Sequence, residues 1–199
     1  MIFRLNCAIT GEVQTISGLL SEHGESVRVC VGSEARESLL KQMDADGSLA
    51  RNRYLHFATH AVLPRHVSDV HEPALLLSLY GDDADDGFVT LSEILGFTLD
   101  ADMVTLSACW SGNVEPSAYA DGLSGLARAF FCAGSRRVTV SLWSLEDSCS
   151  QRMMAEFYRG VEDTATLKAL NQAKRAVLRE REFAHPCFWS GLVLLGEWR

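Results

Sequence analysis

The sequence predicts a single α/β domain with a mostly parallel sheet flanked by helices, and three observations support this fold class. Short apolar runs alternate with amphipathic segments along the chain, which is typical of strands and helices that follow one another. A length of 199 residues suits one hydrophobic core rather than two. We find no internal repeat, low-complexity stretch or linker, so residues 1–199 are expected to form one domain.

The predicted elements follow from apolar periodicity and from turn residues. Helices are expected at residues 12–20, 33–43, 123–131, 148–160 and 166–181. Strands are expected at residues 27–31, 53–59, 74–79, 88–90, 102–108, 137–142 and 191–195. Ser33 is the predicted N-cap of the second helix, and the acidic stretch 81–87 is predicted to be a hairpin loop. The repeated strand–helix order implies right-handed parallel crossovers, and such sheets bind ligands at the carboxyl ends of their strands.

Composition excludes several classes of function. The net charge of −8 disfavours direct binding to nucleic acid, because a phosphate backbone requires a basic face. The chain has no run of eighteen apolar residues and no signal-peptide pattern at its start, so no membrane segment is expected. The six cysteines form no CxxC pair, and we expect reduced thiols in a cytoplasmic protein, most of them buried as small hydrophobic side chains.

Two predicted strands each run directly into a reactive side chain. The segment RYLHFAT is followed by His60, and DMVTLSA is followed by Cys109. Adjacent strands lie about 5 Å apart, so neighbouring strand ends would bring the imidazole to the thiol and favour the thiolate. The Ser111-Gly112 turn would then offer N–H groups to an oxyanion. The alternative is a core histidine and a core cysteine at two strand ends.

The histidines do not indicate a metal site. His56 and His60 have the spacing of a helical metal-binding pair, but they lie on a predicted strand, where four residues span about 13 Å. His66 and His71 lie in the loop that follows, and no cysteine or carboxylate pattern completes a site there. We expect neither a metal nor another cofactor.

Six segments of the chain, in this order, resemble the CHAT family of caspase-like peptidases, which are related to caspases and separases. The segments are HFATHA (56–61), DGFVTLSEI (86–94), LSACWSG (106–112), DGLSGLARAF (121–130), SLWSLED (141–147) and HPCFW (185–189). The similarity extends over nearly the whole chain, from about residue 12 to residue 196.

This resemblance implies a fold, a chemistry and a set of roles. The fold would be the caspase–haemoglobinase fold, a mostly parallel six-stranded sheet flanked by helices. The activity would be that of a cysteine endopeptidase that forms a thioester acyl-enzyme, with Cys109 as nucleophile and His60 as general base or acid. The backbone N–H groups of Cys109 and Ala61 would form the oxyanion hole. The family usually has glycine at the position of Ala61, so a methyl group would border the site.

The resemblance also suggests how a substrate is chosen. Asp147 occupies a position where separases carry an acid that receives a P1 arginine, so Asp147 would form the floor of the S1 pocket and Trp143 a wall. The alternative is that Asp147 is the N-cap of the helix that starts near residue 148. The acidic loop 82–86 would attract basic substrates, or it is simply a solvated loop.

The expected partners are a protein or peptide substrate and an activating sensor domain or subunit, because CHAT domains are commonly fused to a sensor such as a helical repeat array. The chain would then be a domain of a longer protein, or a separate enzyme that another subunit switches on. Two other functions remain open. One is a caspase-like scaffold that has lost activity, and the other is a thiol acyltransferase or esterase, although the motif G-x-S-x-G is absent.

Overall fold

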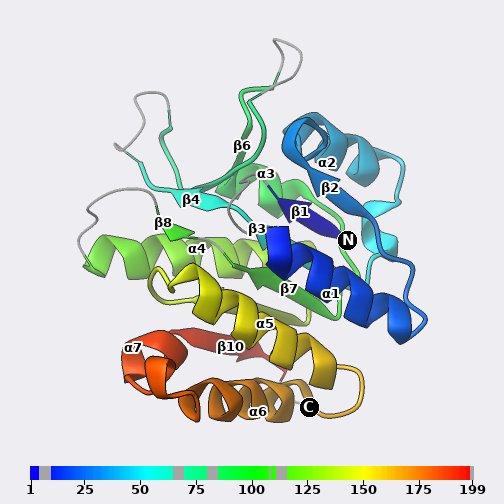
Figure 1. Cartoon of the computed structure of the whole chain (residues 1–199). Coiled ribbons are helices and arrows are strands. Elements are labelled where there is room, and N and C mark those ends of the chain that lie inside the picture. Colours follow the sequence, from blue (N-terminus) through cyan, green and yellow to red (C-terminus); the bar gives the residue numbers. More distant parts are fainter. Residues whose placement is uncertain (5–9, 65–69, 80–84, 108, 111–115, 198–199) are drawn as a thin grey trace.

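The computed structural model describes residues 1–4, 10–64, 70–79, 85–107, 109–110 and 116–197. Within these residues the main sheet has six strands, with helices on both of its faces (Figure 1). From edge to edge the strands are β10 (Leu192–Gly196), β9 (Arg137–Ser141), β7 (Met103–Leu106), β3 (Tyr54–Ala58), β1 (Ile2–Arg4) and β2 (Val29–Val31). The predicted six-stranded sheet between helices is therefore present.

The strand directions make this sheet mixed. The pairs β2–β1, β1–β3, β3–β7 and β7–β9 are parallel, whereas β10 runs antiparallel to β9. Two consecutive long helices, α5 (Asp147–Gly160) and α6 (Thr166–Leu178), lie between β9 and β10 and pack against each other. A single crossover helix brings the chain back to the edge of the sheet where the previous strand began, so that the next strand is parallel. Here the second helix takes the chain to the opposite edge again, so the next strand runs in the opposite direction.

Two hydrophobic clusters cover the two faces of the main sheet. One cluster includes residues of α1 (Thr10–Glu22), α5, α6 and the short α7 (Pro186–Trp189). The other includes residues of α2 (Glu37–Ala45), α3 (Leu91–Gly96) and α4 (Pro116–Ala133). All described residues of β3 and β7 are buried. These two central strands are therefore covered on both faces, which is why they appear in the sequence as continuous apolar runs.

A second sheet lies beyond the carboxyl ends of β3 and β7, because β4 follows β3 and β8 follows β7 along the chain. Its order is β6 (Phe88–Thr90), β5 (Ala74–Leu76), β4 (His60–Val62) and β8 (Cys109–Trp110). The hairpin β5–β6 is antiparallel, as predicted, and residues 80–84 of its loop lie outside the described residues. The strands β4 and β8 were not predicted, because segments of three and two residues are too short for a periodic pattern.

The region before β7 differs from the prediction in two details. Residues Gly32–Glu34 form a 3-10 turn, and α2 begins at Glu37 after Arg36, so the prediction of Ser33 as N-cap is wrong. The helix α3 was not predicted. It begins with a capping box, in which Thr90 Oγ1 accepts the Glu93 N–H and the Glu93 carboxylate accepts the Thr90 N–H.

The helix α4 starts earlier than expected and ends at Ala133, next to Gly134. Gly134 has a φ of +117°, and a Cβ built there would lie 2.1 Å from the carbonyl oxygen of Leu99. A glycine is therefore required where α4 ends and the chain turns towards β9. Neither α4 nor any other helix in the described parts of the chain combines the length and the apolar character needed to cross a bilayer.

A buried polar cluster holds α1 and α5 against the centre of the sheet. Its members are Glu12, His56, Thr105, Ser150 and Tyr158. His56 Nε2 lies 3.0 Å from Glu12 Oε1, and His56 Nδ1 lies 3.0 Å from the Tyr158 hydroxyl. The Tyr158 hydroxyl donates to Thr105 Oγ1 at 3.0 Å, and Ser150 donates to the other oxygen of Glu12. The side chains of Glu12, His56 and Tyr158 are at most 1% exposed, so water does not stabilise these groups and each depends on the others.

Candidate active site

The backbones of His60 and Cys109 lie opposite each other. The strands β3 and β7 are adjacent and parallel, with Phe57 paired to Leu106, and this pairing resumes three residues later between β4 and β8. There His60 is the register partner of Cys109, and Ala61 is the partner of Trp110. Adjacent strands are about 4.8 Å apart. The expectation that the two strands are neighbours is therefore confirmed, at the level of backbone positions.

The main chain turns away from the six-stranded sheet just before His60. β3 ends at Ala58, and the Thr59 hydroxyl donates to the carbonyl oxygen of Leu76 in β5. β4 then pairs with β5, with His60 opposite Leu76. His60 is half-buried, and β4 and β8 lie at the same end of the molecule (Figure 1). The hydrogen bond of Thr59 thus anchors the residue before His60 to the hairpin.

The predicted oxyanion-hole residues lie on β4 and β8. Ala61 is 1% exposed, and its methyl group belongs to the hydrophobic cluster that includes Leu75. An alanine is accommodated here because successive side chains of a strand point to opposite faces, which places the methyl group in the core when His60 faces the other side. The side chain of Cys109 and the predicted turn Ser111-Gly112 lie outside the described part of the structure.

Trp143 and Asp147 follow β9 at the same carboxyl edge of the sheet. The Trp143 indole is 38% exposed, and its Nε1–H donates to the carbonyl oxygen of Cys187 in α7 at 2.8 Å. Its ring lies against Gly191, where a Cβ would come within 2.7 Å of the indole. Trp143 therefore ties the segment after β9 to the segment before β10.

The alternative that Asp147 is the N-cap of this helix is wrong. Asp147 is exposed and is the first residue of α5. The cap is Glu146, whose carboxylate accepts the Cys149 N–H at 2.8 Å. Hydrogen bonds from Ser148 and from Cys149 hold the pKa of Glu146 below its usual value. Because Glu146 already satisfies the helix terminus, the carboxylate of Asp147 is not needed for capping.

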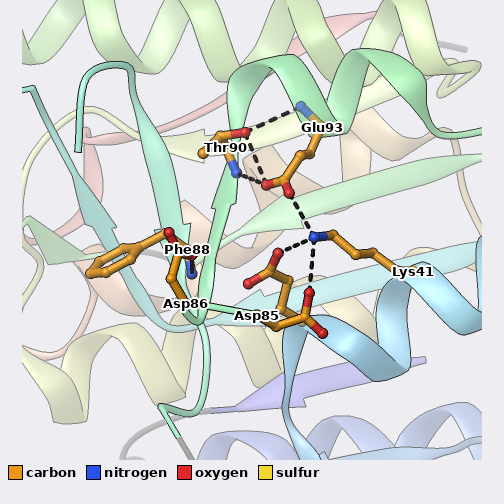
Figure 2. A pocket seen from close by; sticks show the side chains of 7 residues that line it. Lys41, Asp85, Asp86, Phe88, Thr90 and Glu93 are labelled. Carbon is orange, nitrogen blue, oxygen red and sulfur yellow. Dashed lines mark hydrogen bonds and ion pairs between the residues drawn. The ribbon is translucent and has the colours of Figure 1, made fainter. Parts of the chain in front are cut away.

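A cluster of charged side chains that was not predicted lies between α2, α3 and the residues just before β6. Figure 2 shows this region from close by. We call Lys41, Glu37, Asp85 and Glu93 the Lys41 cluster. The Lys41 ammonium lies 3.0 Å from Asp85 Oδ1 and 2.8 Å from Glu93 Oε1, and it also contacts Glu37 one turn earlier on α2. The cluster borders a cavity of about 290 Å³ that Asp86, Phe88 and Thr90 complete. The i,i+4 spacing of Glu37 and Lys41 was the available sequence signal for this contact.

The electrostatics of the Lys41 cluster follow from burial and hydrogen bonding. Glu37 is 2% exposed, and burial raises the pKa of its carboxyl group although Lys41 opposes the shift. Burial alone would lower the pKa of Lys41, but hydrogen bonds to its three carboxylate partners raise it. The pKa of Glu93 is lowered, because hydrogen bonds from Lys41 and Thr90 outweigh its burial. The ammonium is thus the charge that keeps these carboxylates together.

The described residues contain no group of three or more His, Cys, Asp or Glu side chains placed to hold a metal ion. Both ring nitrogens of His56 have partners in the buried polar cluster. His66 lies outside the described residues, and His71 is exposed. Four cysteines, Cys30, Cys132, Cys149 and Cys187, are free thiols. Of these, only Cys30 and Cys149 are buried.

The six-stranded sheet, flanked by helices, defines an α/β class that is compatible with a caspase-like fold. A family model for the CHAT domain matches residues 2–197. The chain therefore belongs to the CHAT family, a caspase-like domain family related to proteases.

Two curated proteins are similar in sequence, and both bear the name tetratricopeptide repeat protein 28. The human protein is 29% identical over 75% of this chain, and the mouse protein is 32% identical over 54% of it. The matched regions make up 7% of the human protein and 4% of the mouse protein. The chain thus corresponds to a small part of these relatives.

Proposed function

We propose that this chain is a cysteine endopeptidase domain in which Cys109 is the nucleophile and His60 the general base and acid. The observation that carries the proposal is the register between β4 and β8, which sets the backbone of His60 opposite that of Cys109. Membership of a protease-related family supports the same chemistry. An imidazole next to a thiol promotes formation of the thiolate, the reactive form of cysteine.

The proposed reaction has two steps. The Cys109 thiol gives its proton to His60 and the sulfur attacks the scissile carbonyl carbon, and the resulting oxyanion is stabilised by the backbone N–H groups of Cys109 and Ala61. His60 gives a proton to the leaving amine as the C–N bond breaks, which leaves a thioester on Cys109. Water, deprotonated by His60, then attacks the thioester, and the carboxylic acid product and free thiol are released.

Replacing Cys109 with alanine is expected to abolish covalent labelling by a peptidyl electrophile, such as an acyloxymethyl ketone. The label should be located on Cys109 by mass spectrometry of the wild-type chain. Cys132→Ser is the matched control, because Cys132 is an exposed free thiol on α4 and its loss should not change labelling. Equal labelling of the wild type and Cys109→Ala would contradict the peptidase proposal and favour an inactive caspase-like interaction module.

We further propose that Asp147 receives a basic P1 side chain and that Trp143 lines the same pocket. Asp147 is exposed, is not used as a helix cap, and follows the strand next to β7. Asp147→Asn is therefore expected to lower kcat/KM for a P1-Arg peptide by about 30-fold or more, since loss of a paired charge costs about 2 kcal/mol or more. The measurement compares fluorogenic peptides that differ only at P1.

A matched control for the P1 experiment is Asp163→Asn. Asp163 is also exposed, but it lies after α5 at the opposite end of that helix. Its replacement should leave P1 preference unchanged. If Asp147→Asn retains the wild-type ratio of P1-Arg to P1-Gln hydrolysis, Asp147 does not form the pocket.

The names of the relatives suggest how such a domain is controlled. Arrays of tetratricopeptide repeats form extended concave binding surfaces, and both relatives are named after this repeat. We propose that this domain likewise acts together with a protein-binding partner or sensor, which would select the substrate or order the active-site loops. The substrate would be a protein or peptide.

A further inference from the structure

The Lys41 cluster joins three segments that are distant in the sequence. Glu37 and Lys41 belong to α2, Asp85 precedes β6, and Glu93 belongs to α3. Figure 2 shows the carboxylates of Asp85 and Glu93 directed at the Lys41 ammonium group, and Glu37 forms the third ion pair with it. Without the ammonium, these three carboxylates would repel one another, and Glu37 would be left as a buried group without its charged partner.

Backbone hydrogen bonds seat the β5–β6 hairpin on the same helix. The Gly87 N–H donates to the Glu37 carboxylate at 2.9 Å, and the Leu77 N–H donates to the Gly87 carbonyl oxygen at 2.7 Å. The Ser78 N–H donates to the carbonyl oxygen of Ala35, just before α2, at 2.7 Å. Both arms of the hairpin therefore depend on the position of α2, and Glu37 is the group that Lys41 and Gly87 share.

Strand pairing connects the β5–β6 hairpin to the candidate active site. Phe88 of β6 pairs with Leu76 of β5, and Leu76 pairs with His60 of β4. The carbonyl oxygen of Leu76 also accepts the hydrogen bond from the Thr59 hydroxyl. His60 in turn is the register partner of Cys109. A continuous ladder of strands therefore runs from the residues that Lys41 holds to the proposed catalytic pair.

We propose that Lys41 is a positioning residue for the peptidase dyad. By holding Glu37, Asp85 and Glu93 together, Lys41 fixes the β5–β6 hairpin, and the hairpin fixes β4 and the main chain of His60 and Ala61. This inference rests on the proposed function, because it assigns Lys41 a role in the geometry of that site. A displacement of about 1 Å in a catalytic group can lower the rate by about 100-fold.

Lys41→Met is therefore expected to lower kcat on a peptide substrate by about 10- to 100-fold while KM changes less than about 3-fold. Methionine keeps much of the length and packing of lysine but removes its charge. Lys41→Arg retains a cation and should recover at least part of the lost kcat. Lys168→Met is the matched control, because Lys168 is exposed on α6, which packs on the other face of the sheet, and its kcat should match the wild type.

Hydrogen–deuterium exchange supplies a measurement that does not depend on activity. In Lys41→Met the amides of residues 60–63 and 74–78 should exchange faster than in the wild type and in Lys168→Met, and those of β9 should be unchanged. If Lys41→Met does not fold, the same measurements are made on Asp85→Asn, which removes only one of the three carboxylates and should show smaller changes in the same direction.

The two proposals can fail separately. A folded Lys41→Met variant with wild-type kcat and wild-type exchange in β4 and β5 would overturn the role of Lys41. Wild-type protein that neither cleaves peptides nor reacts with the peptidyl electrophile would overturn the proposed function, and the exchange data would then decide alone whether Lys41 holds β4 in place. Equal loss of kcat in Lys41→Met and Lys41→Arg, with unchanged exchange, would also overturn the positioning role.

Discussion

Replacing His60 with alanine is expected to lower kcat/KM for peptide hydrolysis by about 10²- to 10⁴-fold, the range that general acid–base catalysis contributes. The proposed base lies on β4, and its register partner on β8 is the proposed nucleophile. Without the imidazole, the thiol of Cys109 would lose the group that favours its ionisation, and the leaving amine would lose its proton donor. Initial rates with a fluorogenic peptide, together with the rate of labelling by the peptidyl electrophile, measure the effect.

His23→Ala is the control for this experiment. His23 is exposed directly after α1 and is remote in sequence from the proposed dyad, so its loss should leave kcat/KM unchanged. Far-UV circular dichroism should confirm that both variants are folded. If His60→Ala keeps the wild-type rate while Cys109→Ala is inactive, then Cys109 has another base and the proposed dyad is wrong.

The second large effect is expected on stability, at the buried polar cluster. Glu12→Ala should lower the free energy of unfolding by about 3–5 kcal/mol, because each buried polar group left without its hydrogen-bond partner costs about 1–3 kcal/mol and this change affects two such groups. Glu12 is 0% exposed, and its two oxygens contact His56 and Ser150. Its removal leaves both of these groups without that partner and also leaves a cavity next to α1.

Denaturant unfolding at neutral pH, analysed with a common m-value, measures this loss. Glu12→Gln is the conservative variant. It retains the shape of the side chain and one acceptor oxygen, so it should cost less than Glu12→Ala. Glu22→Ala at the exposed end of the same helix should change the free energy by less than about 0.5 kcal/mol. A loss at Glu12 no larger than that at Glu22 would show that the buried polar cluster does not stabilise the fold.

Several parts of the fold could be predicted because they depend on local patterns. The apolar runs that became β3, β7 and β9 mark buried strands in any α/β domain. The glycine-bounded acidic stretch separates two strand-like segments, and these form the hairpin β5–β6. The helix α3 had a recognisable capping box at Thr90 and Glu93, although its six residues were too few for a periodic pattern.

Other parts depend on which elements become neighbours. β1 has only three residues, and it is a strand because it lies between β2 and β3. Glu12 occurs on a helix where a charged side chain ordinarily faces water, yet it is buried because His56 and Ser150 meet it there. The mixed direction of the main sheet follows from how α5 and α6 pack against each other. None of these neighbours can be identified from one segment alone.

The strand ends at His60 and Cys109 depend both on local sequence patterns and on contacts between segments that are distant in the sequence. The sequence by itself determined that an imidazole and a thiol each follow a buried strand, because strand-forming apolar runs and reactive residues are local features. Only the tertiary structure decided that His60 and Cys109 are register partners on β4 and β8, and that Lys41 forms ion pairs with Asp85 and Glu93 beside the adjoining hairpin. The physical reason is that register and ion pairing depend on the relative positions of segments distant along the chain, which packing sets and local propensity does not.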